Sequence, residues 1–123
     1  MKQNNTEFGR VGEDAAVEFL KGRDYQIIER NYRLRSSEVD IIAYDKDTLC
    51  FIEVKTREDP LDAEPLEAIT SLKQRKLSLA ATHYLVNNKL LNCPARFDVV
   101  VVIMNTSGNY DINLLQNAFE SVF

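Results

Sequence analysis

The 123-residue chain lacks the features that mark several common protein classes. Its two cysteines, Cys50 and Cys93, form no zinc-binding spacing and predict no disulfide, so we expect reduced thiols in a cytoplasmic protein. No apolar run approaches the roughly 18 residues of a membrane span, and the polar N-terminus predicts no secretory signal. The 15 basic residues are outnumbered by 19 acidic ones, which weakens any role in coating nucleic acid non-specifically. The sequence also contains no P-loop, dinucleotide-binding, zinc-protease or serine-hydrolase motif.

What is present is the composition of a soluble globular protein. Hydrophobic residues make up 45% of the chain and charged residues 28%, which is a typical balance. With four glycines and three prolines the chain has few breaks, and it shows no repeat or linker. We therefore expect one domain over residues 1–123, with a single core.

Hydrophobic periodicity predicts the order of helices and strands. Helices are expected over residues 6–21 and 66–86. Strands are expected over residues 25–30, 38–44, 48–56 and 97–104. Residues 110–114 favour a further strand, whereas 115–119 are also compatible with the start of a short helix. This order predicts an α/β fold in which helices flank a mixed central sheet and the second helix crosses over between parallel strands.

The most informative segment is the hairpin predicted around residues 45–47. If its turn is centred on residues 46–47, Asp40 lies opposite Glu53, and Glu38 lies opposite Lys55. Since side chains alternate along a strand, these four charged residues would share one face. The other face would carry Val39, Ile41, Ile52 and Val54.

Two facing carboxylates repel unless something compensates their charge. Mg²⁺ or Mn²⁺ bound between Asp40 and Glu53 would do so, and Lys55 would then lie beside the ion. Such a set suits attack of water on a phosphodiester, with the lysine stabilising negative charge. The same alternation is also typical of a solvated strand face in which Glu38 and Lys55 form an ordinary ion pair. The hairpin pattern by itself leaves both interpretations open.

Two charged residues interrupt apolar helix surfaces. Glu13 has apolar neighbours three, four and seven positions away, where an unpaired charge is costly. Lys73 lies midway between Ile69 and Leu77 on an apolar stripe. Its ammonium group is expected either to extend into solvent or to point toward the sheet and a bound phosphate.

Several short segments together resemble one known family. They are GRVGE (9–13), RNYR (30–33), EVDIIA (38–43), FIEVKTR (51–57), KQRKL (73–77) and RFDVV (96–100). In this order they resemble the YraN-like family of small bacterial proteins, over nearly the whole chain. That family is grouped with the restriction-endonuclease-like PD-(D/E)XK nucleases and is related to archaeal Holliday-junction resolvases.

The resemblance implies a restriction-endonuclease-like fold and a Mg²⁺- or Mn²⁺-dependent endonuclease acting on DNA, with branched DNA among its candidate substrates. It implies that Asp40 and Glu53 bind the metal, that Lys55 is catalytic, and that Glu13 is an acid at the edge of the site. Lys73 and Gln74 would be substrate-binding neighbours from the second helix. The chain departs from the family by having serines at 36–37, where a glycine usually precedes the acid at position 38.

Basic residues away from the hairpin predict either a rim that binds a nucleic-acid backbone or scattered solvated charges. From this group we assign Arg33 and Arg57 to substrate binding. The apolar tail is expected to complete the core, with a homodimer surface as the alternative.

Two other functions stay open at this point. One is a nucleic-acid-binding module of the same fold without catalysis. The other is a protein-interaction subunit without a metal site.

Overall fold

The computed structural model describes residues 5–58, 69–105 and 107–121. The elements are α1 (Asn5–Gly22), β1 (Gln26–Arg33), β2 (Glu38–Asp45), β3 (Thr48–Arg57), α2 (Ser71–Asn87), β4 (Ala95–Met104) and β5 (Tyr110–Phe119). Their order is the one that the sequence predicts.

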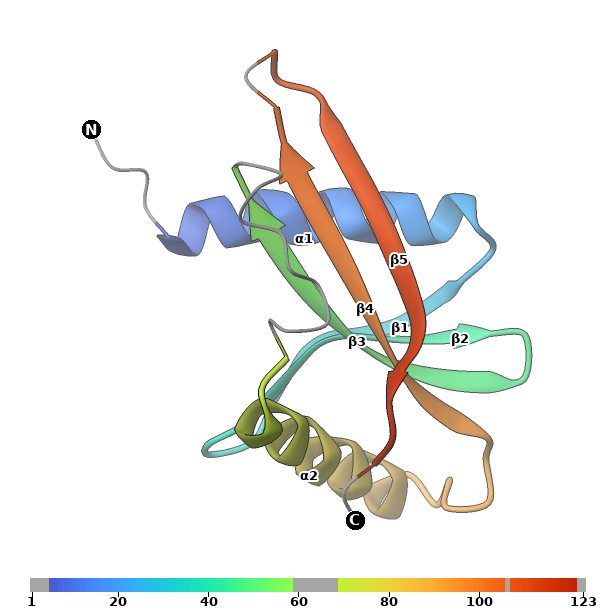
Figure 1. Ribbon diagram of the computed structural model, residues 1–123. Helices are drawn as coiled ribbons and strands as arrows, with labels where there is room; N and C mark the ends of the chain where they lie inside the picture. The colour runs from blue at the N-terminus through green and yellow to red at the C-terminus, as the bar shows by residue number, and fades with distance from the viewer. Residues whose placement is uncertain (1–4, 59–68, 106, 122–123) are drawn as a thin grey trace.

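The five strands form one sheet in the order β1-β2-β3-β4-β5 (Figure 1). Neighbouring strands are antiparallel except for β3 and β4, which are parallel. The chain passes through α2 between these two strands, as expected for a crossover connection. The predicted mixed α/β architecture is therefore confirmed, and it is consistent with a restriction-endonuclease-like fold.

The two helices cover opposite faces of the sheet. On one face Ala16, Val17 and Leu20 of α1 pack against a cluster that includes Ile52 and Val100. On the other face α2 packs against a cluster that includes, from the sheet, Ile42, Leu49, Phe51 and Phe97. The central strands are thus buried on both sides, which explains their nearly continuous apolar sequences.

The second helix begins later than predicted. Residues 69 and 70 precede it, and 66–68 lie outside the described residues. The hydroxyl oxygen of Thr70 accepts a hydrogen bond from the Lys73 N–H at 3.1 Å and caps the helix. This cap satisfies a main-chain donor of the first turn and so sets the start of α2 at Ser71.

The tail of the chain is a strand. A short helix over residues 115–119 is therefore wrong, because Leu115 pairs with Val99 and Phe119 with Phe97 in the β4–β5 ladder. Both side chains pack against core clusters, as Leu114 also does. The expectation that the tail completes the core is confirmed for these residues, while 122–123 lie outside the described residues.

The hairpin has the predicted register. Its paired residues run from Asp45 and Thr48 to Ile41 and Ile52.

No helix in the described ranges is long and apolar enough to cross a bilayer.

Gly12 permits the close approach of α1 to β3. A Cβ atom at this position would overlap the side chain of Thr56, whereas one at Gly9 would meet no atom within 4 Å. Close packing of this helix on the sheet thus requires glycine at only one of the two positions.

We expect Gly12→Ala to lower the free energy of unfolding by about 1–3 kcal/mol, because the new methyl group overpacks the α1–β3 contact. Gly9→Ala is the matched control and should raise it by up to about 1 kcal/mol through helix propensity alone. Urea unfolding followed by circular dichroism measures both. Equal effects of the two substitutions would contradict this account of the contact.

Candidate active site

The β2–β3 ladder ends beside the predicted acids. One residue beyond its last pair, Oδ2 of Asp40 accepts a hydrogen bond from the main-chain N–H of Val54 at 2.8 Å. The Asp40 side chain therefore satisfies a donor at the point where the two strands stop pairing.

The carboxyl groups of Asp40 and Glu53 interact directly. Burial, the charge of Glu53 and a hydrogen bond to Glu53 raise the pKa of Asp40 to about 8. The hydrogen bond from the Val54 N–H lowers this pKa, but by less than the other causes raise it. Glu53 is itself buried, with 5% of its surface exposed. The structure thus brings together the two acids that the hairpin register paired.

Two lysines approach the same oxygen of Glu53. The Nζ atoms of Lys55 and Lys73 lie 3.5 and 3.2 Å from its Oε2. Lys73 therefore points toward the sheet rather than only into solvent, which is one of its two predicted orientations.

Glu38 does not pair with Lys55. The Nε atom of Arg33 lies 3.0 Å from Oε2 of Glu38, because these residues are directly opposite each other in the β1–β2 ladder. The interpretation in which Glu38 and Lys55 form a cross-strand pair is therefore wrong, and Arg33 is placed next to the acid cluster by this contact.

Glu13 is held by two residues of β1. Its Oε1 accepts hydrogen bonds from Arg30 Nε at 2.9 Å and from Asn31 Nδ2 at 3.1 Å. Arg30 also binds Asp14 through Nη2 at 2.6 Å. These contacts compensate the charge that the sequence places on the apolar side of α1. The sequence identifies the acid but not its partners.

Asn31 interrupts the alternation of side chains in β1. Arg30 contacts α1, whereas the ring of Tyr32 lies 5.2 Å from that of Tyr84 on α2. In a regular strand these two alternate residues would share a face. Asn31 between them has a φ of 55°, in the left-handed region that asparagine tolerates better than most residues.

The same change of face occurs in β2. Ile41 packs in the cluster beneath α1, but Val39 packs in the cluster beneath α2. The prediction that Val39 shares a face with Ile41 is therefore wrong. By the register on either side, Asp40 lies opposite Asn31, at the point where both strands change face.

Asp40 connects the two faces of the sheet. It lines a cavity of about 820 Å³ on the α1 side together with Glu13, Arg30, Arg33 and other residues. Glu53 does not line this cavity, and its carboxylate meets Lys73 of α2. The acid of α1 and the lysine of α2 are thus joined through the Asp40–Glu53 contact.

Two predicted substrate-binding residues make other contacts. Gln74 donates from Nε2 to the main-chain oxygen of Ile69 at 3.1 Å and so helps to fix the start of α2. Arg57 donates to the main-chain oxygen of Thr56 at 3.0 Å. Within the described ranges, neither contacts the acid pair.

Asp40 and Glu53 suit a hard divalent cation. The Val54 N–H binds Oδ2 of Asp40, and the two lysines approach Oε2 of Glu53. These contacts leave the second oxygen of each carboxyl group for a metal ion. The described residues contain no group of three or more His, Cys, Asp or Glu side chains arranged for a metal. A two-carboxylate site completed by water is nevertheless an ordinary arrangement for Mg²⁺.

The serines at 36–37 do not distort the entry to β2. The Leu34 N–H donates to the Ser37 carbonyl oxygen at 2.8 Å and closes the β1–β2 turn. Neither serine has a positive φ, so this turn does not require glycine.

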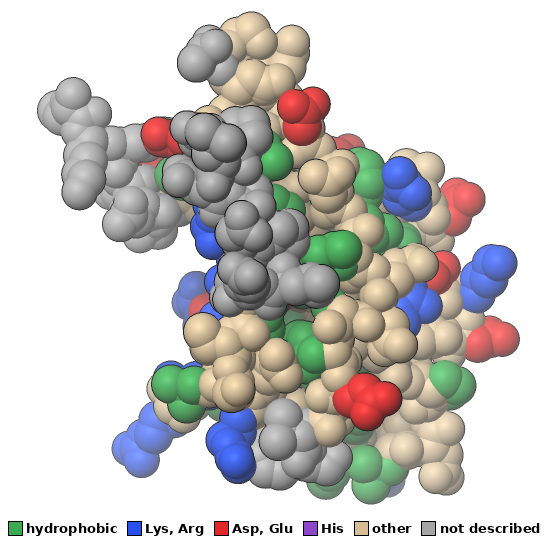
Figure 2. Space-filling model, in the orientation of Figure 1, with side chains coloured by type: hydrophobic (Ala, Val, Ile, Leu, Met, Phe, Trp, Pro, Cys, Tyr) green, Lys and Arg blue, Asp and Glu red, His purple; other side chains and the backbone are tan. Residues whose placement is uncertain are grey.

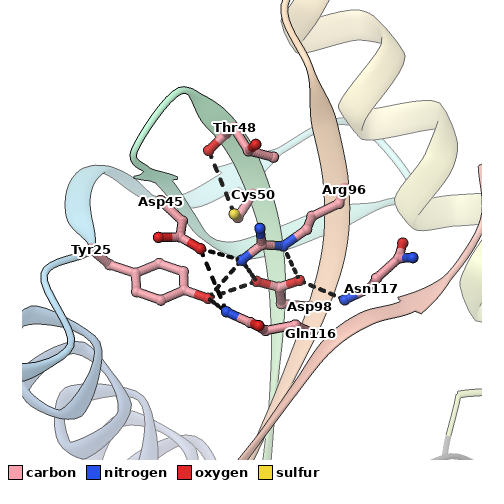
Figure 3. Close-up of polar contacts among 8 residues, drawn as sticks. All are labelled: Tyr25, Asp45, Thr48, Cys50, Arg96, Asp98, Gln116 and Asn117. Atoms are coloured by element: carbon pink, nitrogen blue, oxygen red, sulfur yellow. Dashed lines mark hydrogen bonds and ion pairs between the residues drawn. The ribbon is translucent and has the colours of Figure 1, made fainter.

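A second polar cluster lies at the turn end of the β2–β3 hairpin and was not predicted (Figure 3). Asp98 on β4 has no exposed side-chain surface, and its Oδ1 accepts hydrogen bonds from Arg96 Nε and the Asn117 N–H, both at 2.9 Å. The Tyr25 hydroxyl donates to Oδ2 of Asp98 at 3.0 Å. Arg96 also donates to Asp45 at 2.7 Å.

This cluster is electrostatically satisfied. Burial lowers the pKa of Arg96, but hydrogen bonds to Asp98 and Asp45 outweigh it and raise that pKa above its ordinary value. Burial raises the pKa of Cys50 beside it to about 12, so this thiol stays protonated. The cluster joins β2, β4 and β5 and is structural in character. The segment RFDVV (96–100) is its only sequence signal.

Comparison with known proteins places the site inside the span that matches one protein family. The sequence profile described as "Uncharacterised protein family UPF0102" matches residues 12–102, a span that contains all the acids and lysines above. A UPF0102 protein of Caldicellulosiruptor saccharolyticus is 49% identical, over 94% of this chain and 99% of the relative. One from Geotalea uraniireducens is 43% identical, over 99% and 96%. One from Clostridium botulinum is 44% identical, over 94% and 96%. The resemblance to the YraN-like family is thereby confirmed.

We expect Asp40→Asn to stabilise the metal-free protein at pH 8. The folded-state pKa of Asp40 lies above its ordinary value of 3.8, so the folded state binds the extra proton and stability falls as pH rises from about 4 to about 8. Each unit of pKa shift corresponds to about 1.4 kcal/mol, so the variant should gain a few kcal/mol at the upper end. Urea unfolding in EDTA across this pH range measures the difference. The exposed control Asp111→Asn should change little, and an Asp40→Asn protein with the wild-type pH profile would contradict the shared burial of the two acids.

We expect Arg96→Met to lower the free energy of unfolding by about 3–5 kcal/mol, because it leaves the buried Asp98 carboxylate without its cation. Arg35→Met removes an exposed arginine and serves as the control. Chemical unfolding at neutral pH compares the two variants. A loss of less than about 1 kcal/mol for Arg96→Met would show that the remaining donors suffice.

Proposed function

This chain belongs to the uncharacterised protein family UPF0102, and from its site we propose that it is a metal-dependent endonuclease that hydrolyses DNA phosphodiesters. The observation that carries the proposal is the interaction of the half-buried Asp40 with the buried carboxyl group of Glu53, which Lys55 and Lys73 also approach. A like-charged buried pair is unfavourable for folding, and such pairs are concentrated at functional sites.

Asp40 and Glu53 would hold Mg²⁺ or Mn²⁺ through the oxygens that the Val54 N–H and the two lysines leave, in place of the hydrogen bond between the two carboxyl groups. When bound, such an ion supplies positive charge that polarises a phosphate oxygen and lowers the pKa of a coordinated water. The Val54 N–H orients Asp40 for this task.

Lys55 is the residue to which we assign catalysis. Its side chain is 20% exposed and its ammonium group contacts Glu53, so Lys55 is held beside the acid pair without being fully buried. In that place it would stabilise negative charge that develops on the phosphate. Lys73, which is more exposed, would contact the substrate backbone from α2.

Glu13 acts at the edge of the same cavity as Asp40. Because Arg30 and Asn31 already bind its Oε1, we assign it the role of positioning Arg30 rather than that of a metal ligand. Arg30 is paired with both Glu13 and Asp14, so it would offer a phosphate group in the cavity hydrogen-bond donors rather than net positive charge.

A catalytically silent nucleic-acid-binding module is the second candidate. It is favoured by one observation, namely that Lys55 and Lys73 balance the charge of Glu53 without an ion. In that case the protein would bind DNA through its basic residues, and Mn²⁺ would not be needed for binding.

We expect Asp40→Ala, Glu53→Ala and Lys55→Ala each to reduce cleavage at least about 100-fold while the protein stays folded. The assay incubates end-labelled linear, single-stranded and branched DNA with protein and Mg²⁺ or Mn²⁺, and circular dichroism checks the fold. Asp40→Ala and Glu53→Ala should also lose Mn²⁺ binding in calorimetric titration, whereas Lys55→Ala should retain it.

The matched control is Asp111→Ala, which removes an exposed acid of β5 and should cleave as the unaltered protein does. A fully active Glu53→Ala protein would refute the assignment of the metal site. Mn²⁺ binding without cleavage of any of these DNA structures would favour the silent module.

A further inference from the structure

A second cavity, of about 460 Å³, opens between the β1–β2 turn and the first turns of α2. The charged residues of its lining are four cations and one acid, namely Arg33, Arg35, Lys73, Lys76 and Glu38, and Ser37 also lines it. Figure 2 shows basic side chains gathered at the lower left, where Figure 1 places this turn beside the start of α2. The remainder of that view mixes acidic, basic and apolar side chains.

The positive charge of this cavity is only partly compensated. Glu38 balances Arg33, and Glu53 balances Lys73. Arg35 and Lys76 are exposed and form no ion pair with the described part of the chain. Two uncompensated cations therefore line one small cavity in a protein whose total charge is negative.

Ser37 supplies an independent observation. Its Oγ is buried and has no hydrogen-bond partner among the residues that the structure describes, and the residue as a whole is 8% exposed. Its main-chain carbonyl oxygen accepts the Leu34 N–H and closes the turn, so the carbonyl oxygen is satisfied whereas the hydroxyl is not. A buried hydroxyl without a partner is costly, and a ligand oxygen would supply the missing acceptor.

We infer that this cavity binds a phosphate group, and that in the complex this group is the backbone phosphate adjacent to the one at Asp40 and Glu53. Arg33 and Glu38 line both this cavity and the larger one that contains Asp40, so the two cavities adjoin at this ion pair. Guanidinium, ammonium and hydroxyl donors together match the oxygens of a phosphate. That the cavity binds an anion is inferred from its lining residues alone. That this anion is a phosphate of a nucleic-acid backbone rests on the proposed function.

The first test titrates inorganic phosphate into the full chain, followed by two-dimensional ¹H–¹⁵N NMR. Saturable shifts are expected for residues 34–38 and 73–76. Ser37→Ala should weaken phosphate affinity about tenfold, because a hydrogen bond to a charged group is lost. In phosphate-free buffer it should not lower the free energy of unfolding, because the hydroxyl has no partner there. Shifts confined to other residues, unchanged affinity in Ser37→Ala, or a lower stability of that variant would each overturn the inference.

The second test measures binding of a short single-stranded DNA across a range of salt concentrations in EDTA. Lys76→Gln should reduce the slope of log K against log salt by about 0.7, the value for one phosphate contact on single strands. Lys21→Gln removes the same charge at the far end of α1, where Lys21 pairs with Glu18, and should leave the slope unchanged. Phosphate binding with an unchanged slope in Lys76→Gln would overturn the assignment to the backbone.

Titration of Mn²⁺ into the same variants separates this inference from the proposed function. Ser37→Ala and Lys76→Gln should bind Mn²⁺ like the unaltered protein. If the unaltered protein binds Mn²⁺ and cleaves DNA but does not bind phosphate, only the cavity assignment is overturned. Phosphate binding without Mn²⁺ binding or cleavage supports the cavity and refutes the endonuclease.

Discussion

Asp40 lies where β2 changes face, and the candidate site depends on that change. The side chain of a residue in a regular strand reaches only one face of the sheet, so it would meet groups of either α1 or α2 but not both. Here Asp40 lines the cavity that contains Glu13 of α1 and also contacts Glu53, which binds Lys73 of α2. A single local irregularity thereby gathers groups from both helices around one pair of acids.

The two polar clusters of the sheet differ in how their charges are compensated. Around Asp98, an arginine and neutral donors satisfy the carboxylate. Around Asp40, burial and a second acid raise the pKa of the carboxyl group to about 8. The first arrangement stabilises the fold, while the second retains an unfavourable interaction that a ligand can relieve. Departures of this kind from good local energetics are expected at functional sites rather than in structural clusters.

The sequence predicts the parts of this structure that are set locally. Alternation and a short polar turn give the register of the β2–β3 hairpin, and with it the contact between Asp40 and Glu53. Periodicity also gives the order of elements, and it marks Glu13 and Lys73 as exceptions on their helices. The change of face could not be predicted, because it depends on the left-handed φ of Asn31, and asparagine adopts ordinary strand conformations as well. The partners of Glu13 and the Asp98 cluster depend on residues far apart in the chain, which pattern analysis does not connect.

Asn31 has a counterpart at the other side of the sheet. Asn117 also has a left-handed φ, 53°, and these two residues lie in β1 and β5, the first and last strands of the sheet. Each of these strands also has a register shift against its neighbour. Both outer strands are therefore irregular, and an irregular outer strand is a poor template for a strand from another molecule. In β1 the register shift at Ile27–Glu29 and the left-handed Asn31 are separate irregularities, and only the second shapes the site; both make this edge a poor template for a further strand.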